Sequence, residues 1–134
     1  MTIEEIEKTL PSGFHDACLE KLNIDYGKRE VTLEISVDIG AFDSPRGELK
    51  EANRKGILTV SGLLFCVIEP PDSRSPYQKA KGLWITDSGP VKSAKLLAKL
   101  PESLPNGVFA HYFFINEWNA FIIVVATGAR FDWS

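Results

Sequence analysis

The stretch His111–Ala126, HYFFINEWNAFIIVVA, is the most apolar part of this 134-residue sequence. Two runs of aromatic and β-branched residues flank Asn116–Asn119, and such composition is typical of β-strands. Both runs carry apolar residues at odd and at even positions, so each strand should be buried on both faces. The stretch therefore predicts two core strands of a sheet that is covered on each side.

A different pattern occupies the first third of the chain. Apolar residues alternate with polar ones through Leu22–Tyr26 and again through Val31–Ile39, and Gly27–Arg29 separates the two runs. A period of two is the signature of strands with one buried and one wet face. We expect a β-hairpin here, toward an edge of the sheet.

The remaining elements are predicted from periodicity and from turn residues. Thr2 and Glu5 have the spacing of a capping box, which predicts a short helix that runs to about Thr9. The other expected elements are a loop over 40–55, a strand over 56–69 bent at Gly62, a loop over 70–81, a strand over 82–87 ended by Ser88–Pro90, a helix over 93–100, strands over 108–115 and 120–127, and an extension of the last strand over 129–133.

Strands therefore dominate, and at least three of them are apolar on both faces. Such strands must be covered on each side, which a single open sheet with one wet face does not provide. We predict a mainly β (minor α) fold in one domain, residues 1–134. The expected architecture is an antiparallel sandwich or a partly closed barrel of about six to eight strands, with two short helices covering an end or a face.

Composition limits the classes of function. Hydrophobic residues make up 44% of the chain, charged residues 25%, and the formal net charge is −3, which predicts a globular protein without a general attraction to nucleic acids. The acidic N-terminus lacks a signal-peptide pattern, and the apolar run Ala120–Thr127 is too short to span a membrane. We expect a cytoplasmic protein in which Cys18 and Cys66 are reduced and buried, although a single bridge between them stays open.

Two histidines and a neighbouring aspartate could form a metal site with three ligands. His15 is followed by Asp16, and His111 could supply a third ligand if the fold brings the three together. The competing interpretation is that Phe14–Asp16 only joins the helix to the first strand, which we favour because no metal-ligand spacing is present. Phosphate-binding loops and nucleophile elbows are also absent, so we assign no catalytic residue and expect no cofactor.

Charge is distributed unevenly along the chain. Between Ser73 and Leu100 there are six basic residues against one acidic residue, and Lys92, Lys95 and Lys99 share one face of the predicted helix. The first 25 residues carry six acidic residues against two basic ones. This asymmetry could steer an acidic partner or give a head-to-tail contact between copies, although a solvated helix face would look the same.

The turn within the opening stretch offers a second candidate for binding. Asn116 and Asn119 suit a turn, whereas Trp118 either folds back over the end of the sheet or stands out as an anchor for a partner. We favour folding back, because an exposed indole is costly. Trp118 and its neighbour Glu117 nevertheless join the three lysines as candidate partner-binding residues.

Three segments together resemble a known group of proteins. These are Phe14–Asp16, the hairpin Tyr26–Glu30 and the C-terminal segment Phe114–Ile122, whose core is WNAFI. They resemble small bacterial proteins of unassigned function, some of which are similar to immunity proteins that neutralise polymorphic toxins. The resemblance implies a bacterial, cytoplasmic setting and the fold of that group, and it implies no site residue.

The sequence thus favours a non-enzymatic protein-interaction module, immunity-like in role, whose partner is another protein rather than a membrane or a nucleic acid. The alternative is a small-molecule or metal-binding β-barrel, with hydrolase activity, that uses His15, Asp16 and His111. A protein that only assembles with copies of itself is a third interpretation.

Overall fold

The computed structural model describes residues 1–43, 49–73 and 82–134, and of residues 40–43 and 49–52 it describes the backbone alone. In chain order the elements are α1 (Ile3–Glu7), β1 (Ala17–Asp25), β2 (Glu30–Asp43), β3 (Leu49–Ser61), β4 (Phe65–Ile68), β5 (Leu83–Pro90), α2 (Ala94–Leu97), β6 (Phe109–Ile115), β7 (Ala120–Ala126) and β8 (Gly128–Trp133).

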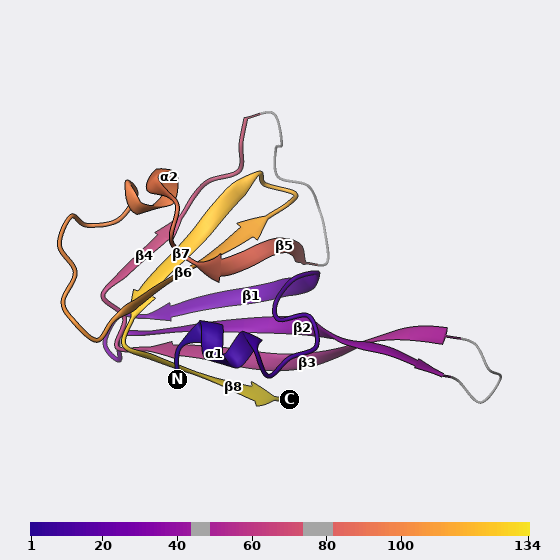
Figure 1. The fold of residues 1–134 in the computed structure, drawn as a ribbon. Coiled ribbons are helices and arrows are strands. Elements are labelled where there is room, and N and C mark those ends of the chain that lie inside the picture. The colour runs from indigo at the N-terminus through magenta and orange to yellow at the C-terminus, as the bar shows by residue number, and fades with distance from the viewer. Residues whose placement is uncertain (44–48, 74–81) are drawn as a thin grey trace.

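All eight strands belong to one antiparallel sheet, in the order β4-β7-β6-β5-β1-β2-β3-β8. The prediction of a mainly β, antiparallel fold with two short helices is confirmed. The sheet is single and is not closed into a barrel, because β4 and β8 remain as its two edges (Figure 1).

The curvature of this single sheet encloses the main core, whereas we expected two packed layers to enclose it. The Phe14 ring contacts Phe113 of β6 at a centroid distance of 6.0 Å and Phe131 of β8 at 5.8 Å. Four strands separate β6 from β8 in the sheet, so the sheet bends around Phe14 and its concave face encloses the main core.

Helix α1 lies against this concave face, as Figure 1 shows. Ile3 and Ile6 are buried there, and the Thr2 hydroxyl accepts a hydrogen bond of 3.1 Å from the Glu5 amide. The helix has only five residues, so packing rather than propensity holds it in place. The cap at Thr2 is as predicted, and the helix ends at Glu7.

Strand β7 is buried on both faces, as its sequence predicts. Ile122 and Val124 belong to the main core on the concave face, whereas Ile123 and Val125 point to the opposite, convex face. Leu96 of α2 is buried outside that core. The two helices therefore cover opposite faces of the sheet.

Two predictions about the middle of the chain are wrong. Most of the expected loop 40–55 is strand, because β2 and β3 continue to pair from Asp38 with Asn53 out to Asp43 with Leu49. A ladder of backbone hydrogen bonds does not require apolar side chains, which is why composition missed it. The extended pair projects beyond the other strands (Figure 1). Residues 44–48 of that loop, and residues 74–81 of the second one, lie outside the described part of the chain.

The expected strand over 56–69 is in fact two strands, β3 and β4. Gly62 adopts a φ of +62°, and a Cβ on it would lie 1.9 Å from the Thr127 hydroxyl oxygen, so the strand is interrupted where only glycine fits.

Three further predictions need correction. Residues Ser88–Pro90 continue β5 instead of ending it. Residues Ala129–Trp133 do not extend β7 but form β8, which pairs with β3 at the opposite edge of the sheet. The β1–β2 hairpin holds the fifth and sixth places in the sheet, and is therefore central.

Candidate functional site

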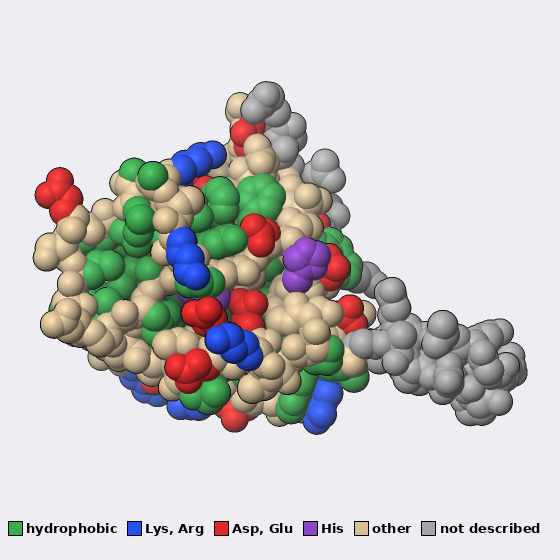
Figure 2. Space-filling model, in the orientation of Figure 1, with side chains coloured by type: hydrophobic (Ala, Val, Ile, Leu, Met, Phe, Trp, Pro, Cys, Tyr) green, Lys and Arg blue, Asp and Glu red, His purple; other side chains and the backbone are tan. Residues whose placement is uncertain are grey.

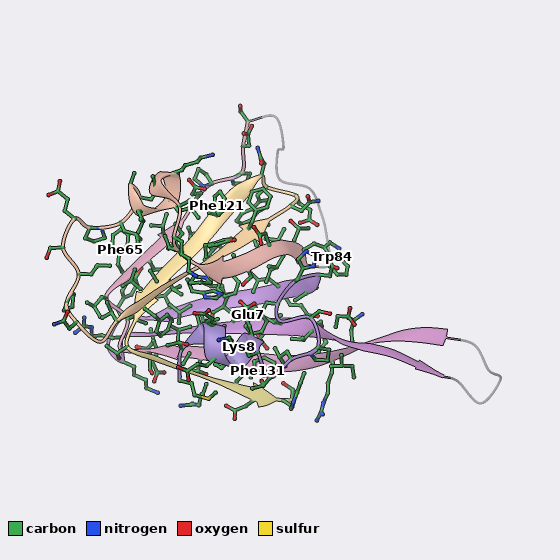
Figure 3. The ribbon with its side chains drawn as sticks, viewed as in Figure 1. Glu7, Lys8, Phe65, Trp84, Phe121 and Phe131 are labelled. Carbon is green, nitrogen blue, oxygen red and sulfur yellow. The ribbon has the colours of Figure 1, made fainter. Side chains whose placement is uncertain are left out.

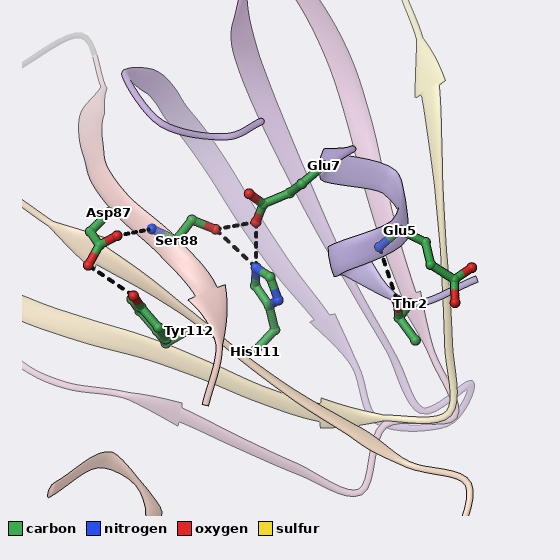
Figure 4. Close-up of polar contacts among 7 residues, drawn as sticks. All are labelled: Thr2, Glu5, Glu7, Asp87, Ser88, His111 and Tyr112. Carbon is green, nitrogen blue, oxygen red and sulfur yellow. Dashed lines mark hydrogen bonds and ion pairs between the residues drawn. The ribbon is translucent and has the colours of Figure 1, made fainter. Parts of the chain in front are cut away.

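A polar cluster ties α1 to the concave face of the sheet (Figure 4). His111 of β6 is 1% exposed, and its Nε2 lies 2.6 Å from Oε1 of Glu7 and 3.0 Å from Oγ of Ser88. The Ser88 hydroxyl donates to the same Glu7 oxygen at 2.6 Å. One helix and two neighbouring strands thus meet at a single carboxylate.

The geometry of this cluster is that of an anchor rather than of a nucleophilic relay. A relay needs the hydroxyl on one imidazole nitrogen and the carboxylate on the other. Here both groups lie on Nε2 of His111, and the hydroxyl of Ser88 is itself bonded to the carboxylate. The cluster therefore supplies hydrogen bonds that hold Glu7, and it offers no activated nucleophile.

The environment of Glu7 favours its ionised form. Burial raises the pKa of this carboxyl, but the hydrogen bonds from His111, from Ser88 and from the backbone of Phe14, together with the electrostatic attraction of His111, bring the pKa below its ordinary value of 4.5. A carboxylate that accepts two short hydrogen bonds is stabilised as the anion. Glu7 is therefore charged at neutral pH and fixes the end of α1.

A second pair of side chains occupies the opposite face of the same strands. The Tyr112 hydroxyl donates to Oδ2 of Asp87 at 2.9 Å, while Oδ1 of Asp87 accepts from the Ser88 amide at 3.0 Å. Burial and the hydrogen bond to Asp87 raise the pKa of Tyr112 to about 12. Tyr112 is thus a neutral phenol whose proton is engaged.

The predicted metal ligands do not form a site. His15 pairs through Nδ1 with Asp16 at 3.1 Å on the surface, whereas His111 is buried with Glu7 and Ser88. Within the described ranges no three histidine, cysteine, aspartate or glutamate side chains are grouped so that they could hold a metal ion. The interpretation of Phe14–Asp16 as a connection fits better, since Asp16 has a φ of +62° where the chain turns into β1.

Both cysteines are free thiols. Burial raises the pKa of Cys66, and burial together with the nearby carboxylates of Glu20 and Glu117 raises the pKa of Cys18. A thiol with a raised pKa is a poor nucleophile at neutral pH.

The three candidate lysines divide into two kinds. Lys99 lies 2.6 Å from Oε2 of Glu69, whose other oxygen accepts from the Phe121 amide at 2.8 Å. Burial raises the pKa of Glu69, but these hydrogen bonds and the positive charges of Lys99 and Lys95 bring it below its ordinary value. Lys99 is therefore an internal partner, whereas Lys92 and Lys95 are exposed.

Lys92 and Lys95 border a hollow of about 390 Å³ on the convex face. The hydrophobic floor is formed by Leu96, Tyr112 and Phe121, and the two aromatic rings meet edge to face at 5.8 Å. Phe121 lies beside α2 in Figure 3, and Figure 2 shows hydrophobic surface interrupted by basic side chains in this region. We call this hollow the α2 surface.

The turn residues lie elsewhere. Trp118 folds back and packs, partly buried, against the main core, although its indole nitrogen is buried without a hydrogen-bond partner among the described residues. Glu117 accepts a hydrogen bond of 2.9 Å from the Trp84 amide and so fastens the turn to β5. Trp84, which the sequence did not single out, is the more exposed tryptophan of this region at 46%.

The sequence did not point to the anchor at Glu7. One signal was present: His111 shares the parity of Phe113 and Ile115, so a strand buried on that face places the imidazole in the core. A buried imidazole needs a hydrogen-bond partner. The partner's identity could not be read, because Glu7 is 104 positions away in the chain.

Comparison with known proteins does not identify a family for this chain. No family model and no curated protein matches this chain. It is similar to a crystal structure of an uncharacterized protein from Neisseria gonorrhoeae, with 15% identity, a TM-score of 0.47, and coverage of 87% of this chain and 90% of that one. We draw no functional inference from this likeness. None of the helices in the described ranges has the length and apolarity to cross a bilayer.

Proposed function

We propose that this protein is a non-enzymatic protein-interaction module that acts in the bacterial cytoplasm, in a role similar to that of immunity proteins. One observation carries the proposal: the side chains of Glu7, Ser88 and His111 bond to one another within the fold, and so do those of Asp87 and Tyr112, while basic and apolar side chains elsewhere are exposed. The resemblance of Phe14–Asp16 and Phe114–Ile122 to the small bacterial group supports the setting.

The internal use of reactive groups is consistent across the molecule. The imidazole of His111 and the hydroxyl of Ser88 hold Glu7, and the Tyr112 hydroxyl holds Asp87. Each of these contacts joins two secondary-structure elements. Their removal would therefore be expected to change stability rather than to stop a chemical step.

The exposed groups are of the kinds that proteins use to bind one another. Tyr26 is 84% exposed, Leu97 49% and Trp84 46%, and Lys92 and Lys95 extend over the α2 surface. Aromatic anchors surrounded by a polar, solvent-accessible rim are common at protein interfaces.

The test uses the proteins that are encoded by the genes adjacent to the gene of this protein. Each product is purified and mixed with this protein, and complexes are measured by size-exclusion chromatography with light scattering and by calorimetry. We expect a stoichiometric complex with one of them, and the same chromatography of the protein alone reports assembly with its own copies.

A thermal-shift panel of divalent metals and nucleotides provides the opposing outcome. A ligand present at a hundredfold excess over its Kd stabilises the folded state by about 2.7 kcal/mol. A clear rise in the unfolding midpoint with one metal or nucleotide, combined with the absence of any protein complex, would favour a small-molecule binder instead.

A further inference from the structure

The α2 surface has the composition of a docking site for one kind of segment. Its floor is apolar, since Leu96 is 6% exposed and the rings of Tyr112 and Phe121 pack against each other. Its border carries Lys92 and Lys95. A hollow of about 390 Å³ accommodates one large side chain rather than a folded domain.

The two border lysines are available for a ligand. Neither Lys92 nor Lys95 makes a hydrogen bond or an ion pair with another residue of the described ranges, in contrast to Lys99 with Glu69. Asp87 also lines the hollow, but both of its oxygens accept internal hydrogen bonds. The border therefore presents two lysines that no carboxylate of the described residues contacts directly, although Lys95 still interacts with the charge of Glu69 over a longer distance.

We propose that the α2 surface binds an acidic segment of a partner protein, one that inserts an apolar side chain over Phe121 between carboxylates that pair with Lys92 and Lys95. The proposal rests on the proposed function, and it names the surface and the chemistry of the partner. Charge complementarity selects an acidic segment, and the apolar floor selects an aliphatic or aromatic side chain at its centre.

A separate protein fits this surface better than a second copy of the chain. The acidic side chains of this protein include Glu4 and Glu5 on α1, which covers the concave face, whereas the α2 surface is on the convex face. Contact between two different surfaces of identical chains is heterologous, and it generates open filaments unless the rotation closes a ring.

The first experiment maps binding of a defined probe onto the folded protein. The probe is a synthetic hexapeptide of two aspartates, two glutamates, a leucine and a tryptophan, with both ends blocked. Two matched peptides replace either the four acids by their amides or the two apolar residues by serine. Amide shifts of the ¹⁵N-labelled protein are followed during each titration.

We expect the acidic, apolar peptide to shift the amides of residues 92–97, Tyr112 and Phe121. Each matched peptide should bind at least about tenfold more weakly. Raising the salt from 50 mM to 500 mM should weaken binding severalfold, since exposed charges are screened over roughly 4–14 Å at these salt concentrations. Shifts confined to another surface, or no shifts at millimolar peptide, would overturn the proposal.

Charge reversal tests the two lysines directly. The variant Lys92→Glu/Lys95→Glu should lose peptide binding at least about tenfold. The variant Lys21→Glu/Lys28→Glu changes the net charge equally on exposed positions of β1 and of the β1–β2 turn, and it should bind like the wild type. Equal binding by both variants would contradict the assignment.

The same pair of variants separates this inference from the proposed function. If an adjacent-gene product binds the wild type and the Lys92→Glu/Lys95→Glu variant equally well, the interaction module stands and the α2 surface is wrong. If no product binds but the peptide does, the surface stands and the proposed function is wrong. Stronger binding of a single-stranded oligonucleotide than of the peptide would replace the protein partner by a nucleic acid.

Discussion

Glu7 is the residue on which the position of α1 most depends. Its carboxylate accepts hydrogen bonds from Ser88 and His111, which lie on two strands of the concave face. We predict that Glu7→Gln lowers the free energy of unfolding at pH 7 by about 1.5–3 kcal/mol, because hydrogen bonds to a charged group are lost. Urea denaturation measures the change. Glu5→Gln is the control, since that side chain is exposed, and a change within about 0.5 kcal/mol is expected.

The same carboxylate makes stability depend on pH in a definite direction. The pKa of Glu7 is lower in the folded state than the ordinary value of 4.5. Its contribution is therefore complete above that value, and it is lost as the pH falls through the lower, folded pKa. We predict that the difference in unfolding free energy between wild type and Glu7→Gln shrinks as the pH is lowered from 6 toward 3. A difference that stays constant over this range would show that Glu7 does not titrate as described.

The two thiols should react slowly in the folded protein. Burial raises the pKa of both Cys18 and Cys66, and the carboxylates of Glu20 and Glu117 add to the effect at Cys18. We predict that iodoacetamide at pH 7.5 modifies both at well below the rate of a free cysteine peptide, as followed by mass spectrometry, and that guanidinium restores the rate. Rapid modification of Cys18 without denaturant would indicate an activated thiol.

At the scale of elements, β7 provides a direct test of coverage on both faces of the sheet. Ile122 faces the concave core, Ile123 faces the convex side, and both are at most 2% exposed, whereas Ile57 of β3 is 36% exposed. We predict that Ile122→Ala and Ile123→Ala each cost about 2–5 kcal/mol in the free energy of unfolding. Ile57→Ala should cost clearly less, and chemical denaturation of the three variants measures the difference. A small effect at Ile123 would mean that the helix over the convex face contributes little burial.

Elements were predictable where local pattern determines them. The alternation through Val31–Ile39 identified β2, and the two-sided apolar runs identified β6 and β7. The sequence did not predict that residues 49–55 form a strand, because these residues are mostly polar and are held in the sheet by backbone pairing with β2. The sequence predicts a bend at Gly62 but not two separate strands, because the break depends on the positive φ of Gly62 and on its contact with Thr127, which is distant in sequence.

For the whole molecule, Phe14 closes the curved sheet. Its ring contacts β6 through Phe113 and β8 through Phe131, and it is fully buried. We predict that Phe14→Ala lowers the free energy of unfolding by about 3–5 kcal/mol and raises amide hydrogen exchange in both β6 and β8. Tyr26→Ala, at an 84% exposed aromatic, should change stability by less than about 0.5 kcal/mol. Loss of protection in only one of the two strands would show that Phe14 does not bridge them.

The strand order could not be predicted from the sequence, and neither could most of the candidate site. Periodicity gives the faces of a strand but not its neighbours, so the pattern predicts β8 as a continuation of β7, although β8 pairs with β3. The sequence predicts only part of the α2 surface. The lysines share one predicted face, but the aromatic floor comes from β6 and β7, and the pairing of Lys99 with Glu69 requires the folded chain.

The place of β8 also bears on how the chain acquires its structure during synthesis. The strand that completes the β3 edge follows the other described strands in the chain, so a nascent chain that contains β1 to β7 but not yet β8 presents an open ladder of amides and carbonyls along β3. Until β8 emerges from the ribosome, that ladder is available to any extended polypeptide nearby, and a ribosome stalled before β8 is complete would hold a species prone to aggregate.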